Sequence, residues 1–200
     1  MLLAGCGNGL FLETMLQAGF RVTGQESDPL LLSRARMRLG QAAGLNLGPC
    51  EHLSYEDNSF DYLLLLFALN RSVEPDLVLQ EAARVARRGI LVGMLNRWPR
   101  PTRQESAFTA QTSSEEAPLF PLSWGRLKKM IRSRIAVRQM RARSVLPGPQ
   151  FTWRDSALAN LLNRGFYPAD WGAFYAVRMD LPGEAAALPL GALSAKPGIA

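Results

Sequence analysis

The chain has 200 residues, of which 48% are hydrophobic and 20% charged, with a formal net charge of +6, values that suit one ordinary globular domain. No apolar run approaches 18 residues and the two cysteines do not make a disulfide framework, so the composition excludes a transmembrane protein and a disulfide-stapled secreted one. Met1–Ala4 is too short and uncharged for a signal peptide, and we therefore expect a cytoplasmic protein.

A glycine-rich turn stands almost at the start of the chain. Ala4-Gly5-Cys6-Gly7-Asn8-Gly9 follows a short apolar run and precedes a helix predicted over residues 10–18, which Gly19 ends. Glycines let backbone N–H groups approach a ligand without a clash of Cβ atoms. The spacing is G-x-G-x-G, and Leu10 stands where the dinucleotide fingerprint has its third glycine. The turn therefore predicts an adenosine-containing ligand, with a nicotinamide-dependent oxidoreductase as the less favoured alternative.

An acidic residue follows the next predicted strand. Residues 20–24 read as a short strand, and Glu26 at its end is placed to accept hydrogen bonds from ribose hydroxyls. Asp28-Pro29 then begins a helix, with Asp28 as N-cap, that runs to about Leu39 and stops at Gly40.

The middle of the chain continues this alternation. Residues 60–67 form a nearly continuous apolar run, typical of a strand buried on both faces of a parallel sheet. Pro75 opens a helix predicted to end near Arg88 with Gly89 as its cap, and residues 90–95 form another buried strand. Such alternation predicts a doubly wound α/β sheet.

The second half is less regular. Residues 97–123 are rich in proline and polar side chains, and we expect a lid-like loop there. The remaining pattern predicts a helix over 123–133, a strand over 136–146, a helix over 154–164, a strand over 172–181 and a disordered tail over 183–200.

Most of the positive charge falls between residues 126 and 143. This basic stretch contains no acid and consists of Arg126, Lys128, Lys129, Arg132, Arg134, Arg138, Arg141 and Arg143. Because it crosses from a predicted helix into a predicted strand, its charges need not share one face. We interpret it as solvated surface, with an anionic substrate, an RNA backbone or a membrane surface as the alternatives.

In these motifs, residues 1–95 resemble the class I S-adenosylmethionine-dependent methyltransferases, and in particular their small-molecule branch, known as methyltransferase type 11. Gly5–Gly9 is similar to the first motif of that family, and Gln25-Glu26-Ser27 to its ribose-binding acid. The segment from Glu51 to Asp61 is similar to the part that passes the adenine and enters the fourth strand. Against the family pattern, Leu3 and Pro49 replace acids, and the chain begins inside the first strand, so we expect a truncated N-terminus.

The resemblance implies a methyltransferase domain over residues 1–182 with a doubly wound Rossmann-like sheet, mostly parallel with an antiparallel last strand. It implies S-adenosylmethionine as cofactor and a small-molecule acceptor. The alternatives are an RNA-directed methyltransferase that uses the basic stretch, and a cofactor-binding but inactive truncated homologue. The residues expected to bind the cofactor are Gly5, Cys6, Gly7, Asn8, Gly9, Glu26, Ser27, Glu51, His52, Leu53 and Phe67.

No catalytic residue is predicted, because methyl transfer from a sulfonium depends mostly on positioning. Asn70 and Asn96, after two buried strands, are either substrate-orienting residues or turn-forming asparagines. His52 is the single histidine and the cysteines lack ligand-like spacing, so we expect no metal site. The pattern indicates neither the acceptor nor an oligomeric state.

Overall fold

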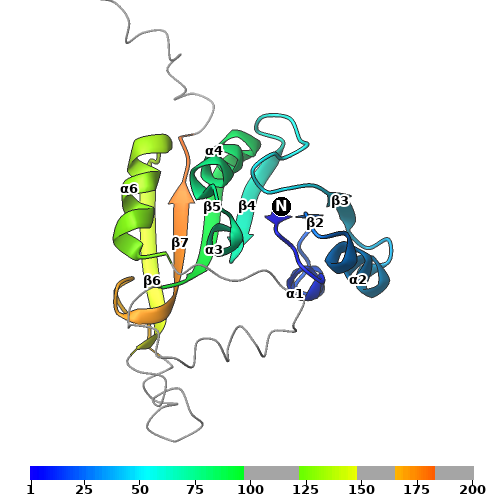
Figure 1. Cartoon of the computed structure of the whole chain (residues 1–200), viewed down its shortest axis with the longest axis horizontal. Helices are drawn as coiled ribbons and strands as arrows, with labels where there is room; N and C mark the ends of the chain where they lie inside the picture. The colour runs from blue at the N-terminus through cyan, green and yellow to red at the C-terminus, as the bar shows by residue number, and fades with distance from the viewer. Residues whose placement is uncertain (97–121, 148–164, 183–200) are drawn as a thin grey trace, which may run out of the picture.

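The computed structural model describes residues 1–96, 122–147 and 165–182, in which strands and helices alternate along the chain (Figure 1). In chain order the elements are β1 Leu2–Ala4, α1 Leu10–Gln17, β2 Thr23–Glu26, α2 Pro29–Leu39, β3 Gly44–Leu47, β4 Phe60–Leu66, α3 Ala68–Arg71, α4 Pro75–Val85, β5 Ala86–Leu95, α6 Trp124–Arg134, β6 Gln139–Pro147 and β7 Gly172–Asp180.

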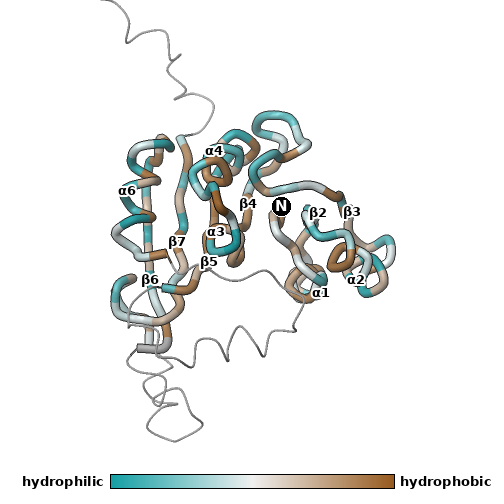
Figure 2. Tube along the Cα trace, in the orientation of Figure 1, coloured by the Kyte–Doolittle hydropathy of each residue, from teal (hydrophilic) through white to brown (hydrophobic). Residues whose placement is uncertain are grey.

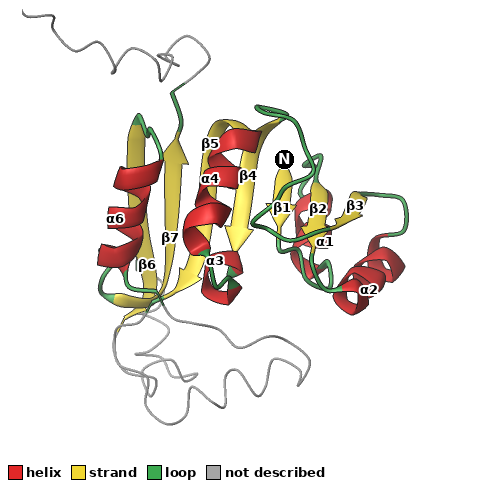
Figure 3. Ribbon diagram, turned by 45° about the horizontal axis from the view of Figure 1, so that its top comes forward, coloured by secondary structure: helices red, strands yellow, loops and turns green. Residues whose placement is uncertain are grey.

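The described strands form one seven-stranded sheet in the order β3-β2-β1-β4-β5-β7-β6 (Figure 3). The first five strands pair parallel to one another, whereas β7 runs antiparallel to both of its neighbours, β5 and β6. The predicted fold class, a mostly parallel doubly wound sheet with an antiparallel last strand, is confirmed. The chain moves outward from β1 to β3 and then returns to β4 on the other side of β1, so the strand order reverses between β1 and β4.

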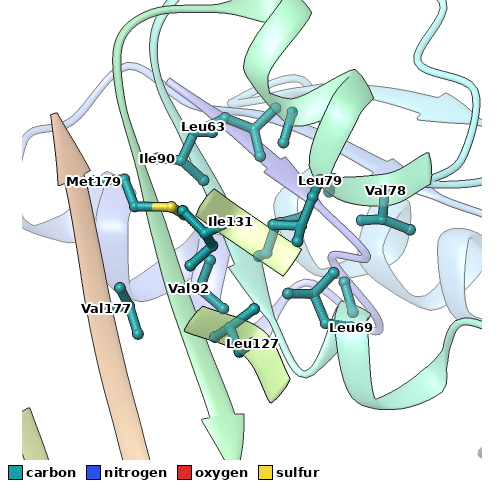
Figure 4. Close-up of a cluster of buried hydrophobic side chains, with 14 of the residues drawn as sticks. Leu63, Leu69, Val78, Leu79, Ile90, Val92, Leu127, Ile131, Val177 and Met179 are labelled. Atoms are coloured by element: carbon teal, nitrogen blue, oxygen red, sulfur yellow. The ribbon is translucent and has the colours of Figure 1, made fainter. Parts of the chain in front are cut away.

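Hydrophobic cores lie on both faces of the sheet. The main core packs the sheet against α4 and α6, and Figure 4 shows its buried side chains, among them Leu63, Leu79, Ile90, Val92, Leu127 and Ile131. The second core lies under α1 and contains Leu3, Leu12, Met15 and Leu64. Residues adjacent in the sequence, such as Leu63 and Leu64, therefore point to opposite faces of the sheet and pack in different cores. Burial on both faces explains the continuous apolar run of β4, which Figure 2 shows as hydrophobic, whereas α6 is more hydrophilic.

The helix boundaries predicted for α1 and α2 are confirmed. Asp28 caps α2, since its carboxylate accepts hydrogen bonds from the N–H groups of Leu30 and Leu31. Gly19 and Gly40 follow the two helices with φ angles of +85° and +55°, a left-handed conformation that favours glycine.

The predicted end of α4 is wrong. The helix ends at Val85, and β5 begins directly at Ala86, so Gly89 lies inside a strand and caps nothing. A Cβ atom at Gly89 would lie 2.7 Å from the carbonyl oxygen of Met179 in β7. The glycine is therefore needed for the close approach of two strands, a role that its position in the sequence does not distinguish from a helix stop.

Two strands of the first half also differ from the prediction. β2 starts at Thr23 rather than residue 20, because its pairing with β1 starts at Leu2, and Phe20 is exposed. The edge strand β3 was not predicted, since most of its residues are exposed and leave no alternating pattern. Phe67 lies beyond β4, where the backbone turns into α3.

The helices and strands predicted around residues 123–133, 136–146 and 172–181 correspond to α6, β6 and β7. The lid-like loop, for almost all of its length, the helix over 154–164 and the tail over 183–200 lie outside the described residues. Within the described ranges, no helix has the length and apolar character needed to cross a membrane.

Candidate cofactor site

The residues predicted to bind the cofactor converge at one edge of the sheet. In an open α/β sheet, ligands bind beyond the carboxyl ends of the strands, at the point where the strand order reverses. Here that point lies between β1 and β4. The Gly5–Gly9 turn follows β1, Glu26 ends β2, the segment 48–53 follows β3, and Phe67 follows β4. The topology therefore brings all four predicted segments to one region at the strand ends, which is called the crevice below.

The backbone of the glycine turn requires glycine at each of its three glycine positions. Gly5, Gly7 and Gly9 have φ angles of +73°, +56° and +80°. A Cβ atom at Gly9 would lie 3.0 Å from the Cβ of Ala35, so this glycine allows α1 to pack closely on α2. A Cβ atom at Gly7, in contrast, would meet nothing within 4 Å. The turn is thus tightly packed at its end and leaves open space at Gly7.

The carboxylate of Glu26 fastens this turn to the end of β2. Glu26 is 4% exposed, and its Oε2 accepts a hydrogen bond of 2.7 Å from the Gly7 N–H. Its Oε1 accepts from the N–H groups of Ser27 and Asp28, at 2.9 and 3.1 Å, and from the Ser27 hydroxyl at 3.3 Å. Glu26 therefore orders the glycine turn as well as standing at the predicted ribose position.

Asn8 and Ser27 occupy the outer part of the same turn region. The Asn8 side-chain oxygen accepts a hydrogen bond from the Leu10 N–H at the start of α1, and its carbonyl accepts one from Arg38. Ser27 is exposed at the end of β2. Both side chains are thus at least partly exposed at the strand ends.

The segment expected to pass the adenine is held by side chains that sequence reasoning did not identify. Gln25 is fully buried, and its amide nitrogen donates to the carbonyls of Pro49 and His52 at 2.8 and 3.2 Å. Its Oε1 is buried and accepts no hydrogen bond from the described residues, which leaves an acceptor beside this segment. The signal for Gln25 was its place directly before Glu26, as a polar side chain inside a buried strand.

Arg84 of α4 anchors the same segment from the other side. Its guanidinium donates to the carbonyls of Leu53 and Tyr55 and forms ion pairs with Asp57 and Glu81. Glu81 in turn accepts a hydrogen bond of 2.9 Å from the Leu53 N–H. The hydrogen bond from Arg84 lowers the pKa of Glu81, so the pair stays charged near neutral pH.

The three adenine-segment residues differ in exposure. Leu53 is 4% exposed and packs in the main core, so what it offers a ligand is its backbone. His52 is exposed, and Glu51 is half-buried and accepts a hydrogen bond from the Ser72 hydroxyl at the end of α3. The Glu51 contact joins the segment after β3 to the segment after β4.

Both cysteines lie beside this crevice as neutral thiols. Cys6 is buried in the glycine turn, and Cys50 Sγ would lie 3.6 Å from a Cβ atom at Gly5. Burial, and secondarily the charge of Glu26, raises the pKa of each thiol to about 12. Because the thiolate is the nucleophile, neither cysteine is suited to covalent catalysis near neutral pH.

We therefore expect both cysteines of the native protein to react very slowly with Ellman's reagent at neutral pH. The rate should rise about tenfold per pH unit, because the thiolate fraction does so below the pKa. In denaturant both thiols should react at once. A native protein that releases one equivalent of thionitrobenzoate within seconds at neutral pH would contradict this assignment.

The two asparagines after the buried strands have structural roles. Asn70 is fully buried and exchanges two hydrogen bonds with the backbone of Leu95, at 3.3 and 3.0 Å. Asn96 is 7% exposed and donates to the carbonyls of Ala169 and Gly172. Of the two interpretations left open by the sequence, these contacts favour the structural one.

The basic stretch is divided between the two faces of the sheet. α6 packs its apolar side chains on the main core, together with Met140 and Ala142 of β6. Because side chains alternate along a strand, Arg141 and Arg143 point to the opposite face, away from the charges of α6. The stretch therefore does not form one continuous basic surface. In the described part of the chain, no group of acidic, histidine or cysteine side chains is arranged to hold a metal ion.

Comparison with known proteins agrees with this geometry. Residues 2–92 match the family described as a methyltransferase domain. No curated protein matches the chain significantly.

Three solved structures illustrate the similarity in fold. A protein from Thermotoga maritima, described as an SAM-dependent methyltransferase and possible histamine N-methyltransferase, has a TM-score of 0.65 at 20% identity, over 90% of this chain and 81% of that chain. An SAM-dependent methyltransferase from Methanosarcina mazei has a TM-score of 0.64 at 14% identity, over 92% of both chains. Magnesium protoporphyrin IX methyltransferase from Synechocystis, with bound SAH, has a TM-score of 0.57 at 11% identity, over 90% of this chain and 73% of that chain.

Proposed function

We propose that the protein transfers a methyl group from S-adenosylmethionine to a small-molecule acceptor. Residues 2–92 match the methyltransferase domain family, and the fold is similar to that of solved SAM-dependent methyltransferases. The observation that carries the proposal is the Gly7–Glu26 contact. It places a glycine with open space beside a buried carboxylate at the reversal point of the sheet.

The residues present fit this cofactor. The open space at Gly7 and the N-terminus of α1 suit its methionine end, because the dipole of a helix favours a carboxylate at its N-terminus. Glu26 suits the ribose hydroxyls, and the segment 49–53, held by Gln25 and Arg84, suits the adenine.

When bound, the cofactor would supply a methyl group on a positively charged sulfur. The methyl group would pass to a nucleophilic atom of the acceptor, the sulfur would keep the electron pair of the broken bond, and the acceptor would lose a proton. The protein's task is then to hold the acceptor in line and to exclude water. We assign no general base among the described residues, because Glu26, Glu51 and His52 are the groups proposed to hold the cofactor, and this suits an acceptor that loses its proton late or to solvent.

Calorimetric titration of the wild-type protein tests the proposal directly. S-adenosylmethionine and S-adenosylhomocysteine are expected to bind at one site with micromolar affinity, and NAD is expected not to bind. Tight NAD binding without S-adenosylmethionine binding would place the protein among the oxidoreductases. Absence of binding by all three would refute the proposed cofactor site.

The divided basic stretch predicts that the protein does not form a stable RNA complex at about 0.15 M salt. Fluorescence anisotropy with a labelled RNA checks this over a series of salt concentrations. The triple variant Arg132→Gln, Arg134→Gln and Arg138→Gln is the comparison. A sub-micromolar complex at that salt, lost in the triple variant, would favour an RNA-directed methyltransferase instead.

A further inference from the structure

The backbone at the end of β4 is strained at an aromatic residue. Phe67 has a φ of +56° and a ψ of 0°, a left-handed conformation that is unfavourable for a bulky side chain. Its N–H donates to the Gly93 carbonyl at 2.8 Å, and its own carbonyl accepts from the N–H groups of Asn70 and Arg71. The conformation is thus fixed from both sides. Strain of this kind is found preferentially at ligand sites.

The ring of Phe67 pairs with the ring of Phe174 on β7, two strands from β4. The ring centroids of Phe67 and Phe174 are 5.7 Å apart with an interplanar angle of 55°. A Cβ atom at Gly93 would lie 3.1 Å from Phe174 and 2.8 Å from the Leu66 side chain. Gly93 therefore allows Phe174 to lie down on the sheet beside Leu66. Phe67 and Phe174 are both only half-buried, so their rings remain accessible.

The strand register places this pair next to positive charge. Leu66, Gly93, Ala176 and Arg143 are register partners on four successive strands, so they form one row on one face. This row begins at Leu66 of β4, next to the cofactor crevice. It continues over the small residues Gly93 and Ala176 and ends at the exposed Arg143. Among the described residues, Arg143 donates a hydrogen bond only to the backbone carbonyl of its neighbour Ala142.

A second row on the same face adds to this charge. Arg178 and Arg141 are direct cross-strand partners on β7 and β6, an arrangement in which like charges repel. Asp180 offsets part of this charge through a 2.9 Å ion pair with Arg178. The face thus combines the paired rings of Phe67 and Phe174 with an excess of positive charge on β7 and β6, two and three strands from β4.

We propose that this face binds the methyl acceptor, and that the acceptor is a planar aromatic molecule carrying an acidic group. Its ring would stack against Phe67 and Phe174, and its acid would be bound by Arg143. The inference rests on the proposed function, because an acceptor on this face can receive a methyl group only if S-adenosylmethionine is bound in the neighbouring crevice.

Binding of simple probes tests the chemical class. In the presence of saturating S-adenosylhomocysteine, 2-naphthoate, 2-naphthylmethylamine and cyclohexanecarboxylate are titrated and observed by NMR. 2-Naphthoate should bind at least about tenfold more tightly than the amine, which lacks the acid, and than the saturated acid, which lacks the ring. Equal affinity for all three probes, or no binding of 2-naphthoate, would overturn the inference.

Matched variants test the residues. Phe67→Asn removes the ring but introduces a residue that tolerates a left-handed backbone, so 2-naphthoate binding should fall about tenfold with no loss of thermal stability. Phe174→Leu should weaken 2-naphthoate similarly and keeps the position apolar. Arg143→Gln should remove the preference for the acid over the amine and leave the preference for a ring. Phe20→Leu and Arg132→Gln, exposed residues elsewhere, are the controls.

The outcomes separate this inference from the proposed function. If S-adenosylhomocysteine binds and the three variants leave 2-naphthoate binding unchanged, the acceptor inference is wrong and the cofactor assignment stands. If wild type binds no S-adenosylhomocysteine, the proposed function fails and the inference fails with it. If Phe67→Asn unfolds, Phe174→Leu and Arg143→Gln decide the matter.

Discussion

Replacement of Gly7 by valine is expected to abolish S-adenosylmethionine binding, with a loss of at least about a hundredfold in affinity, while the protein stays folded. Nothing within 4 Å would meet a Cβ atom at this position, so the valine side chain would fill the space assigned to the cofactor rather than clash with the protein. The φ of +56° adds backbone strain of roughly 1–2 kcal/mol. Calorimetric titration and urea unfolding measure the two effects separately.

Gly40→Val is the matched control. Gly40 has nearly the same φ, +55°, and equally open surroundings, but it follows α2 at the other end of that helix from Glu26. Its ψ of −123° makes this backbone conformation unfavourable for valine, so the variant should lose stability as well and yet keep full cofactor affinity. Undiminished affinity in Gly7→Val, or an equal loss of affinity in both variants, would contradict the assignment of the turn.

Glu26→Ala is expected to weaken S-adenosylmethionine binding by about 1–3 kcal/mol, the range for a lost charge-assisted hydrogen bond. The structure adds a second effect. The N–H groups of Gly7, Ser27 and Asp28 would lose their acceptor, so the free energy of unfolding should also fall, by roughly 1–3 kcal/mol. Titration of the variant with S-adenosylmethionine and urea unfolding check both numbers.

Glu13→Ala serves as the control for Glu26, because Glu13 is a half-exposed acid of α1 whose ion pair with Arg38 is a surface contact. It should change either quantity by less than about 1 kcal/mol. A Glu26→Ala protein that binds the cofactor as tightly as the wild type would show that the carboxylate orders the turn without touching the ligand.

Local chemistry made the first half of the fold predictable. The Asp28 cap, the glycine stops at Gly19 and Gly40, and the buried run of β4 each depend on a few neighbouring residues. The same holds for the glycine turn and Glu26, whose spacing reflects a single strand-helix-strand unit. Local signals of this kind are present in the sequence because their physical causes act within a few residues.

Features that depend on partners far along the chain could not be predicted. Gly89 looks like a helix stop until β7 is placed beside it, and β3 is recognisable as a strand only through its pairing with β2. Gln25 and Arg84 hold the segment after β3 from a neighbouring strand and from a helix. Their roles follow from the packing of separate elements, which no local pattern encodes.

The sequence by itself thus determined the class of fold, and it predicted the glycine turn and the acid beside it as a cofactor site, because each is a local pattern with a local cause. Only the tertiary structure showed the backbone contacts that favour a structural role for Asn70 and Asn96, the division of the basic stretch between two faces, and the contact of Phe67 with Phe174. The reason is physical: which side chains share a face depends on strand register and on the packing of the helices. Both are set by contacts between residues that lie far apart in the chain.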